Sequence, residues 1–231
     1  DLLSPNKYSF ADFDLIHQLS IRIKYLKYTS QKLPSGIIKK LELLRQNLMN
    51  CSVHTHRSHG DFTPWNTWSD DKGRLLVYDW ELANENYPLG FDFFHFIIQN
   101  GVLTQKKSWH KLSDEISHLS SNIFKDGNYE TYLSLYLLIH VLNYLEIYEN
   151  QKVWHEQIHW LLETWNLALS EVLQSKVNQR ELVILDTFDH LHFSDYSGLK
   201  LSDQVEKVSE YSDIDLLMEK KTSKTLVQFL E

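Results

Sequence analysis

Glycine and proline are scarce in this chain, with 7 Gly and 4 Pro among 231 residues. Sandwiches and barrels of many short strands need Gly- and Pro-rich turns between their strands. The scarcity therefore predicts a mainly α-helical protein with long helices. Hydrophobic residues make up 42% of the chain, which is enough to bury a core of one large or two small domains.

The charge balance and the cysteine content exclude several classes of partner and compartment. There are 31 acidic residues against 23 Lys and Arg, so a net charge of −8 gives no attraction to nucleic acid or to anionic lipid. One cysteine cannot form an internal disulfide. No signal peptide pattern is present, and the apolar run 135–145 is too short to cross a bilayer. We expect a cytoplasmic protein without nucleic-acid or membrane partners.

Apolar residues recur at the three- and four-residue spacing of a helix face in most of the chain. The predicted helices cover approximately residues 9–28, 37–48, 107–123, 129–148 and 151–175, with a shorter one at 90–99 that stops at Asn100 and Gly101. In the second of these helices, the charged residues should lie on the exposed face; they are Lys39, Lys40, Glu42 and Arg45.

The stretch 53–68 has neither a helical nor a strand period and is dense in polar groups and rings, which is typical of a functional loop. Residues 70–73 supply turn formers, and the apolar run 74–79 after them is rich enough for a buried strand. Together they predict a small β-hairpin.

The composition changes after Val177, which favours a boundary near residue 176 and a short α/β extension over 176–231. Residues 181–193 are interpreted as a strand or buried segment, and 212–230 as a short strand followed by a helix. A cluster of polar residues in the first of these segments is interpreted as a strand edge; it comprises Asp186, Asp189, His190 and His192.

The strongest chemical signal is the run His59-Gly60-Asp61, with Asn66 five positions beyond Asp61 and Asp79 thirteen beyond Asn66. Phosphoryl transfer to a hydroxyl needs a carboxylate aimed at the attacking oxygen. It also needs an amide oxygen and a second carboxylate to hold Mg²⁺ over the phosphates. A loop followed by a hairpin can bring Asp79 opposite Asp61 and Asn66.

This pattern, H-G-D-x-x-x-x-N followed by an apolar residue and D-W-E, resembles the aminoglycoside phosphotransferase and choline kinase family. Protein kinases carry the related H-R-D-x-x-x-x-N and D-F-G. The resemblance covers about residues 9–175 and implies a protein-kinase-like C-terminal lobe, here assigned to 1–175, that uses ATP and Mg²⁺.

The same resemblance implies roles for individual residues. Asp61 would be the catalytic base, Asn66 and Asp79 the Mg²⁺ ligands, and His59 a support of the loop. Glu81 would lie near the metal, which completes a nucleotide- and metal-binding set of His59, Asn66, Asp79 and Glu81. Asp92 resembles the later aspartate that braces the catalytic loop.

The chain departs from the family in one respect: no glycine-rich phosphate loop is present, because the glycines are scattered singly. Complete members have an N-terminal lobe whose strands and lysine hold the ATP phosphates, and we expect that lobe upstream of residue 1. A kinase-shaped binding or scaffold module without activity is the leading alternative.

Two further interpretations remain open. His54, His56 and His59 partly match a metallo-β-lactamase-type zinc signature, although Ser58 stands where that signature has Asp. Residues 212–217, with 197–200 upstream, resemble the start of a polymerase-β-type nucleotidyltransferase, in which Asp213 and Asp215 would bind metal from one strand face.

The sequence thus predicts a phosphotransferase that moves the ATP γ-phosphate to a hydroxyl of a small molecule such as an amino alcohol, a sugar or an aminoglycoside-like compound.

Overall fold

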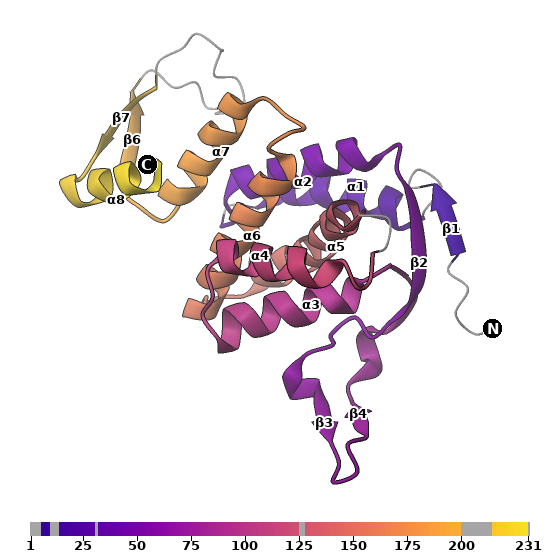
Figure 1. The fold of residues 1–231 in the computed structure, drawn as a ribbon. Coiled ribbons are helices and arrows are strands. Elements are labelled where there is room, and N and C mark those ends of the chain that lie inside the picture. Colours follow the sequence, from indigo (N-terminus) through magenta and orange to yellow (C-terminus); the bar gives the residue numbers. More distant parts are fainter. Residues whose placement is uncertain (1–5, 10–13, 31, 125–127, 200–213, 231) are drawn as a thin grey trace.

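The computed structural model describes residues 6–9, 14–30, 32–124, 128–199 and 214–230 of the chain (Figure 1). The protein is mainly helical, as predicted. The described helices are α1 (Asp14–Thr29), α2 (Ser35–Leu48), α3 (Phe91–Gln99), α4 (Trp109–Ser120), α5 (Tyr129–Asn150), α6 (Glu156–Leu173), α7 (Gln179–Leu191) and α8 (Lys220–Leu230).

Short antiparallel sheets accompany the helices. The strands are β1 (Asn6–Ser9), β2 (Ser52–Ser58), β3 (Thr67–Ser69), β4 (Leu75–Val77), β5 (Asn84–Pro88), β6 (Tyr196–Leu199) and β7 (Asp215–Met218). They pair as a three-stranded sheet in the order β1-β2-β5, a β3-β4 hairpin and a β6-β7 pair. The hairpin predicted after the polar loop is thereby confirmed.

Helix α5 lies at the centre of the helical body and contacts α1, α2, α3 and α6. Every residue over 132–142 of this helix is buried, which is the pattern of a helix segment enclosed on all sides. Its residues from Leu133 to Leu145 include a set that is at most 3% exposed: Leu133, Leu135, Tyr136, Leu137, Leu138, Ile139, Val141, Leu142 and Leu145. The apolar run 135–145 is thus core, and none of the described helices combines the length and apolarity needed to cross a bilayer.

The hairpin differs from the expectation in one respect. Figure 1 shows β3 and β4 extending away from the helical body. Leu75 and Leu76 are 58% and 44% exposed, so the predicted buried strand is instead an exposed ribbon. The backbone of β4 pairs with β3, but the core helices do not cover the apolar side chains of β4.

Three predictions about local structure are wrong. Residues 52–58 form a strand, because β2 is paired on both sides by β1 and β5. Residues 6–9 form β1, so the first helix does not include residue 9, and its described part is α1 over Asp14–Thr29. After α3 the chain continues through a π-helix over Asn100–Thr104 instead of stopping at Gly101.

The segment after residue 176 begins with a helix, α7, so the strand interpretation of 181–193 is wrong, whereas the alternative of a buried segment holds for Leu182, Leu185 and Leu191. It packs against α2 and α6. The predicted strand and helix of the tail are confirmed as β7 and α8.

Lys40 corrects the expectation that the charged residues of α2 face solvent, because its side chain is fully buried. Its ammonium group donates to Asp186 on α7 and to Asn166 on α6. Asp189 lies 3.7 Å away through Oδ2 and accepts from the Gly36 N–H at 2.8 Å through Oδ1. The acidic residues assigned to a strand edge are thus helix-borne partners of Lys40, Asp189 buried and Asp186 partly buried.

Candidate active site

The loop that carries Asp61 starts where β2 ends at Ser58. Gly60 turns the chain there with a φ of 86°, a left-handed conformation that costs glycine little. A Cβ atom at this position would lie 2.4 Å from the carbonyl oxygen of Leu82. The backbone of the loop therefore approaches the 80–82 segment as closely as only glycine allows.

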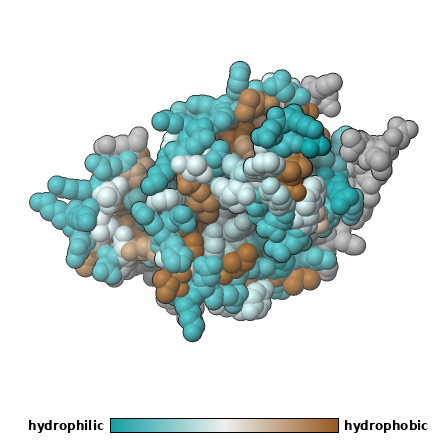
Figure 2. Space-filling model, turned by 90° about the horizontal axis from the view of Figure 1, so that it is seen from below, coloured by the Kyte–Doolittle hydropathy of each residue, from teal (hydrophilic) through white to brown (hydrophobic). Residues whose placement is uncertain are grey.

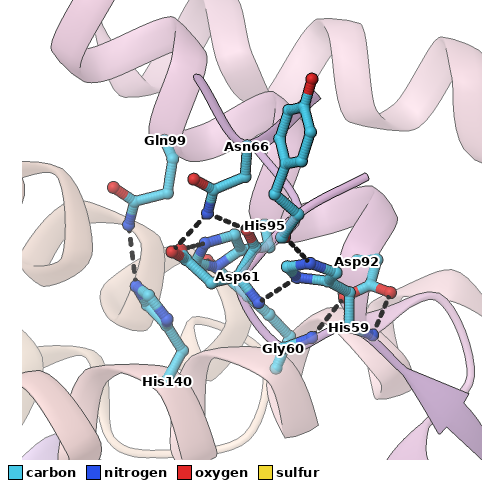
Figure 3. Close-up of polar contacts among 10 residues, drawn as sticks. His59, Gly60, Asp61, Asn66, Asp92, His95, Gln99 and His140 are labelled. Atoms are coloured by element: carbon cyan, nitrogen blue, oxygen red, sulfur yellow. Dashed lines mark hydrogen bonds and ion pairs between the residues drawn. The ribbon is translucent and has the colours of Figure 1, made fainter. Parts of the chain in front are cut away.

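Asp92 holds this loop from the first turn of α3. Its two carboxylate oxygens accept from consecutive backbone N–H groups, His59 at 2.7 Å and Gly60 at 2.9 Å (Figure 3). A carboxylate bound by two adjacent amides fixes both the position and the direction of the peptide between them. The bracing contact expected of Asp92 is present.

His59 fastens the same loop to the strand that precedes Asp79. Its ring is 2% exposed. Nδ1 accepts from the Asp61 N–H at 3.2 Å, and Nε2 lies 2.6 Å from the carbonyl oxygen of Tyr78. This pairing requires the tautomer with the proton on Nε2. Both ring nitrogens are thus occupied by protein, which gives His59 a supporting role.

The Asp61 carboxylate lies between two side-chain donors (Figure 3). Asn66 donates its amide N–H to Oδ2 at 2.8 Å, and His95 Nε2 lies 2.8 Å from Oδ1. Partial burial by itself raises the pKa of Asp61, whereas the hydrogen bonds from His95 and Asn66 lower it. The net pKa is below the usual value of 3.8. Asp61 is therefore ionised at neutral pH and can accept a proton.

Asn66 lies opposite the end of β4. Its carbonyl oxygen accepts from the Tyr78 N–H at 2.9 Å, and the next residue, Thr67, pairs with Val77. Asp79 follows directly. Because Nδ2 of Asn66 donates to Asp61, the amide oxygen is the atom of that side chain that can meet a cation. The fold thus brings Asn66 beside Asp61 and places the backbone of Asp79 one residue beyond the partner of Asn66.

The backbone at Asp79 is in a conformation that few residues adopt. Its φ of 62° and ψ of 54° are left-handed, and it directly precedes a short 3₁₀ helix over Trp80–Leu82. A non-glycine residue in this region costs about 1 to 3 kcal/mol, and such residues concentrate at functional sites. Asp79 and Glu81 are both exposed. Their carboxylates are open to ligands from solvent.

Sequence reasoning missed His95, which is 1% exposed on α3. Its Nδ1 lies 3.4 Å from the hydroxyl of Tyr136 on α5. Gln99 and His140 form a further buried contact at 2.9 Å. The signal for His95 was its position three residues after Asp92, since residues three apart on a helix share a face. A helix that directs Asp92 at the loop also directs His95 there.

A cavity of about 300 Å³ opens beside the loop, with Phe62 and Asp92 in its wall. Other parts of the wall are the rings of Phe93 and Phe96 and the amide of Asn100. An ion pair of Lys107 and Glu115, 2.6 Å apart, lies at the same cavity. The cavity thus offers apolar surface together with hydrogen-bonding groups.

Large apolar side chains in the hairpin and in the segments on either side of it are between 44% and 58% exposed: Trp65, Trp68, Leu75, Leu76, Tyr78, Trp80 and Leu82. On the face seen from below, apolar residues stand among polar ones (Figure 2). Exposed apolar side chains gathered in one stretch of the chain favour an interaction or ligand site there.

The structure gives no support to the zinc interpretation. Within the described parts of the chain, no group of three or more His, Cys, Asp or Glu side chains is arranged to hold a metal ion. His54 and His56 lie on β2 and pair through their backbones with β1 and β5.

Of the tail residues that resemble a nucleotidyltransferase, Asp213 lies outside the described residues, and Asp215 is exposed at the start of β7.

Comparison of the chain with protein-family models, with curated proteins and with solved structures yields no match.

Proposed function

We propose that this protein is a kinase-like C-terminal lobe that takes part in ATP- and Mg²⁺-dependent phosphoryl transfer to a hydroxyl of a small molecule. The observation that carries the proposal is the contact of Asp61 with Asn66 in a loop braced by Asp92. His59 and Asn66 join that loop to Tyr78, which lies between the end of β4 and Asp79. An ionised carboxylate, an amide oxygen and an exposed carboxylate are the groups that this chemistry needs.

Each residue has a distinct task in the proposal. Asp61 accepts the proton of the attacking hydroxyl, and its two hydrogen bonds hold it in one orientation. The Asn66 amide oxygen and the Asp79 carboxylate would hold Mg²⁺, an ion that is commonly bound by one or two protein carboxylates together with substrate phosphates. Bound Mg²⁺ neutralises charge on the phosphates. Glu81 would stand at the edge of that site.

The acceptor would enter the cavity beside Phe62. Its aromatic walls and the amide of Asn100 suit a compact molecule that carries both hydroxyls and apolar surface, such as an amino alcohol or a sugar derivative. The nucleotide would be held jointly with an N-terminal lobe encoded upstream of residue 1. The exposed apolar side chains of the hairpin, Trp68 and Leu76 among them, are a surface that such a lobe would cover.

An inactive binding module is the second candidate, and the exposed hairpin favours it. A hairpin with half-exposed Trp68, flanked by half-exposed Trp65 and Trp80, can dock a partner whether or not Asp61 is catalytic. The two candidates differ in turnover.

The deciding experiment is ATP consumption by the full-length parent protein with Mg²⁺ and a panel of amino alcohols, sugars and aminoglycosides. The proposal expects acceptor-dependent formation of ADP that stops when Mg²⁺ is chelated. Formation of ADP by no member of the panel, from a folded protein, would favour the binding module.

Asp79 offers a test that needs no acceptor. Replacing Asp79 by Ala should abolish Mg²⁺-dependent nucleotide binding, measured by calorimetric titration of the parent protein. The matched control is Asp71→Ala, an exposed aspartate in the turn of the same hairpin. Equal affinity in the two variants would contradict the metal assignment.

A further inference from the structure

A row of buried polar side chains lies behind Asp61, on the side away from the hairpin. Asp61 Oδ1 meets Nε2 of His95 at 2.8 Å, and Nδ1 of His95 meets the Tyr136 hydroxyl at 3.4 Å. Both residues are almost wholly buried, with His95 at 1% exposure and Tyr136 at 0%. Buried polar groups are retained where they are hydrogen-bonded, and here the bonds lead directly to the proposed base.

The two contacts of His95 determine which nitrogen carries its proton. Burial raises the pKa of Tyr136 well above 10, so its hydroxyl keeps its proton; that hydroxyl neighbours both Gln99 and Nδ1 of His95, and it can donate to Nδ1. A neutral imidazole has one donor and one acceptor nitrogen. With Nδ1 accepting, Nε2 bears the hydrogen and donates to Asp61. The partner of the second nitrogen thus sets the tautomer of the first.

The ring of His95 also has little freedom to turn. It lies between aromatic neighbours, with ring centroids 4.9 Å from His140, 6.1 Å from Tyr136 and 6.4 Å from Phe91. A donor held by such packing fixes the carboxylate that it contacts. Asn66 holds Oδ2 and His95 holds Oδ1, so the plane of the Asp61 carboxylate is set at both oxygens.

We propose that His95 is the positioning residue of this site: held by Tyr136 with its proton on Nε2, it donates to Asp61 and aims the remaining lone pairs of that carboxylate at the acceptor hydroxyl. This inference rests on the proposed function. When the hydroxyl oxygen attacks, its proton passes to Asp61, and His95 keeps its own proton. His95 touches neither the acceptor nor the phosphate.

The kinetic test uses the full-length parent protein with two substitutions at His95. Phe keeps a ring but has no donor, and Gln places an amide N–H close to where Nε2 stands. We expect His95→Phe to lower kcat about 100-fold, as misplacement of a reacting group by about 1 Å does, with unchanged KM for ATP and acceptor. His95→Gln should recover at least about tenfold of that loss.

Two tyrosine variants provide the matched comparison. Tyr136→Phe removes the hydroxyl behind His95 and should lower kcat to a value between wild type and His95→Phe. Tyr148→Phe removes a hydroxyl from another buried tyrosine of α5 and should leave kcat unchanged. Wild-type kcat in His95→Phe would overturn the proposal. So would equal losses in the Phe and Gln variants when both have wild-type circular dichroism.

A second measurement does not depend on turnover. In ¹⁵N-labelled protein, long-range ¹H–¹⁵N spectra report the tautomer of each imidazole, and the His95 signals are those missing from the His95→Gln spectrum. We expect the Nε2–H form in the wild type and an added Nδ1–H population in Tyr136→Phe. A wild-type His95 protonated on Nδ1 refutes the positioning role even if the protein turns over its acceptor. The expected tautomer in a protein that consumes no ATP refutes the proposed function instead.

Discussion

Two aspartates of this protein have hydrogen-bond donors around their carboxylates, yet their pKa values move in opposite directions. Asp61 in the candidate site has a pKa below its usual value, whereas that of Asp189 on α7 rises to about 7. The side chain of Asp61 is 24% exposed and that of Asp189 is 4% exposed. Burial raises the pKa of both carboxyl groups. The two values differ because the groups around Asp61 outweigh this rise, whereas those around Asp189 do not.

At Asp189 the offset fails for two reasons. Burial raises the pKa most, and the charge of Asp186 raises it further. The Lys40 ammonium and the Gly36 N–H lower it by less, and Lys40 lies closer to Asp186 than to Asp189. At Asp61, the hydrogen bonds of His95 and Asn66 lower the pKa, and no second carboxylate among the described residues raises it. Lys40 is shared by Asp186 and the buried Asp189 and joins their helix to α2, whereas Asp61 accepts several hydrogen bonds and stays ionised.

The largest effect expected from this contrast is on turnover. Asp61→Asn removes the proposed base and should lower kcat by about 10²- to 10⁴-fold, while the affinity for ATP barely changes. Asp189→Asn should leave kcat within about twofold, because Asp189 lies on α7 among the residues around Lys40. Steady-state kinetics of the parent protein measure both. Full turnover by Asp61→Asn would refute the role of base.

The next effect is on stability. Lys40→Met leaves Asp186 and Asp189 without their shared cation and should lower the free energy of unfolding by about 3 to 5 kcal/mol. The control is Lys39→Met, whose side chain is partly exposed and pairs weakly with Glu42 at 3.9 Å; its effect should stay within about 1 kcal/mol. Urea unfolding at pH 7 compares them. Equal losses would show that the buried cation is not what joins α2 to α7.

The smallest effect is a pH dependence. Because the pKa of Asp189 rises from 3.8 to about 7 on folding, the folded protein binds this proton more tightly than the unfolded chain. Its contribution to stability is therefore full below pH 3.8, falls as the pH rises to about 7 and is constant above. The stability of Asp189→Asn relative to wild type should rise over that interval. A difference that is independent of pH would contradict the raised pKa.

Local patterns predicted the parts of this fold whose signals are local. The apolar spacing of α2 and α5 and the turn residues 70–73 were sufficient for the helices and the hairpin. The motif spacing also predicted that Asp61 and Asn66 lie together. Strand β2 was missed because two of its buried residues, Thr55 and Ser58, are polar and hide the alternation.

Other features depend on residues far apart in the chain. Burial of Lys40 is stabilised by Asp186, which is 146 positions away, so no pattern within α2 could reveal it. Helix α7 was misjudged because the run Leu182-Val183-Ile184 is typical of a strand, although its packing on α2 makes it helical. His95 was overlooked because a histidine among phenylalanines is most simply read as core, and its partner Asp61 is 34 positions away.

The pairing of β1 with β2 ties the start of the chain to the loop. Four residue pairs, from Asn6 with Thr55 to Ser9 with Ser52, join these strands, and β2 then leads, through an irregularity between His56 and Ser58, to the peptide that Asp92 holds. A pull on the polypeptide ahead of Asn6 is borne by backbone hydrogen bonds and reaches Asp61 through a single strand. A displacement of β1 is thus mechanically coupled to the carboxylate that would take the proton.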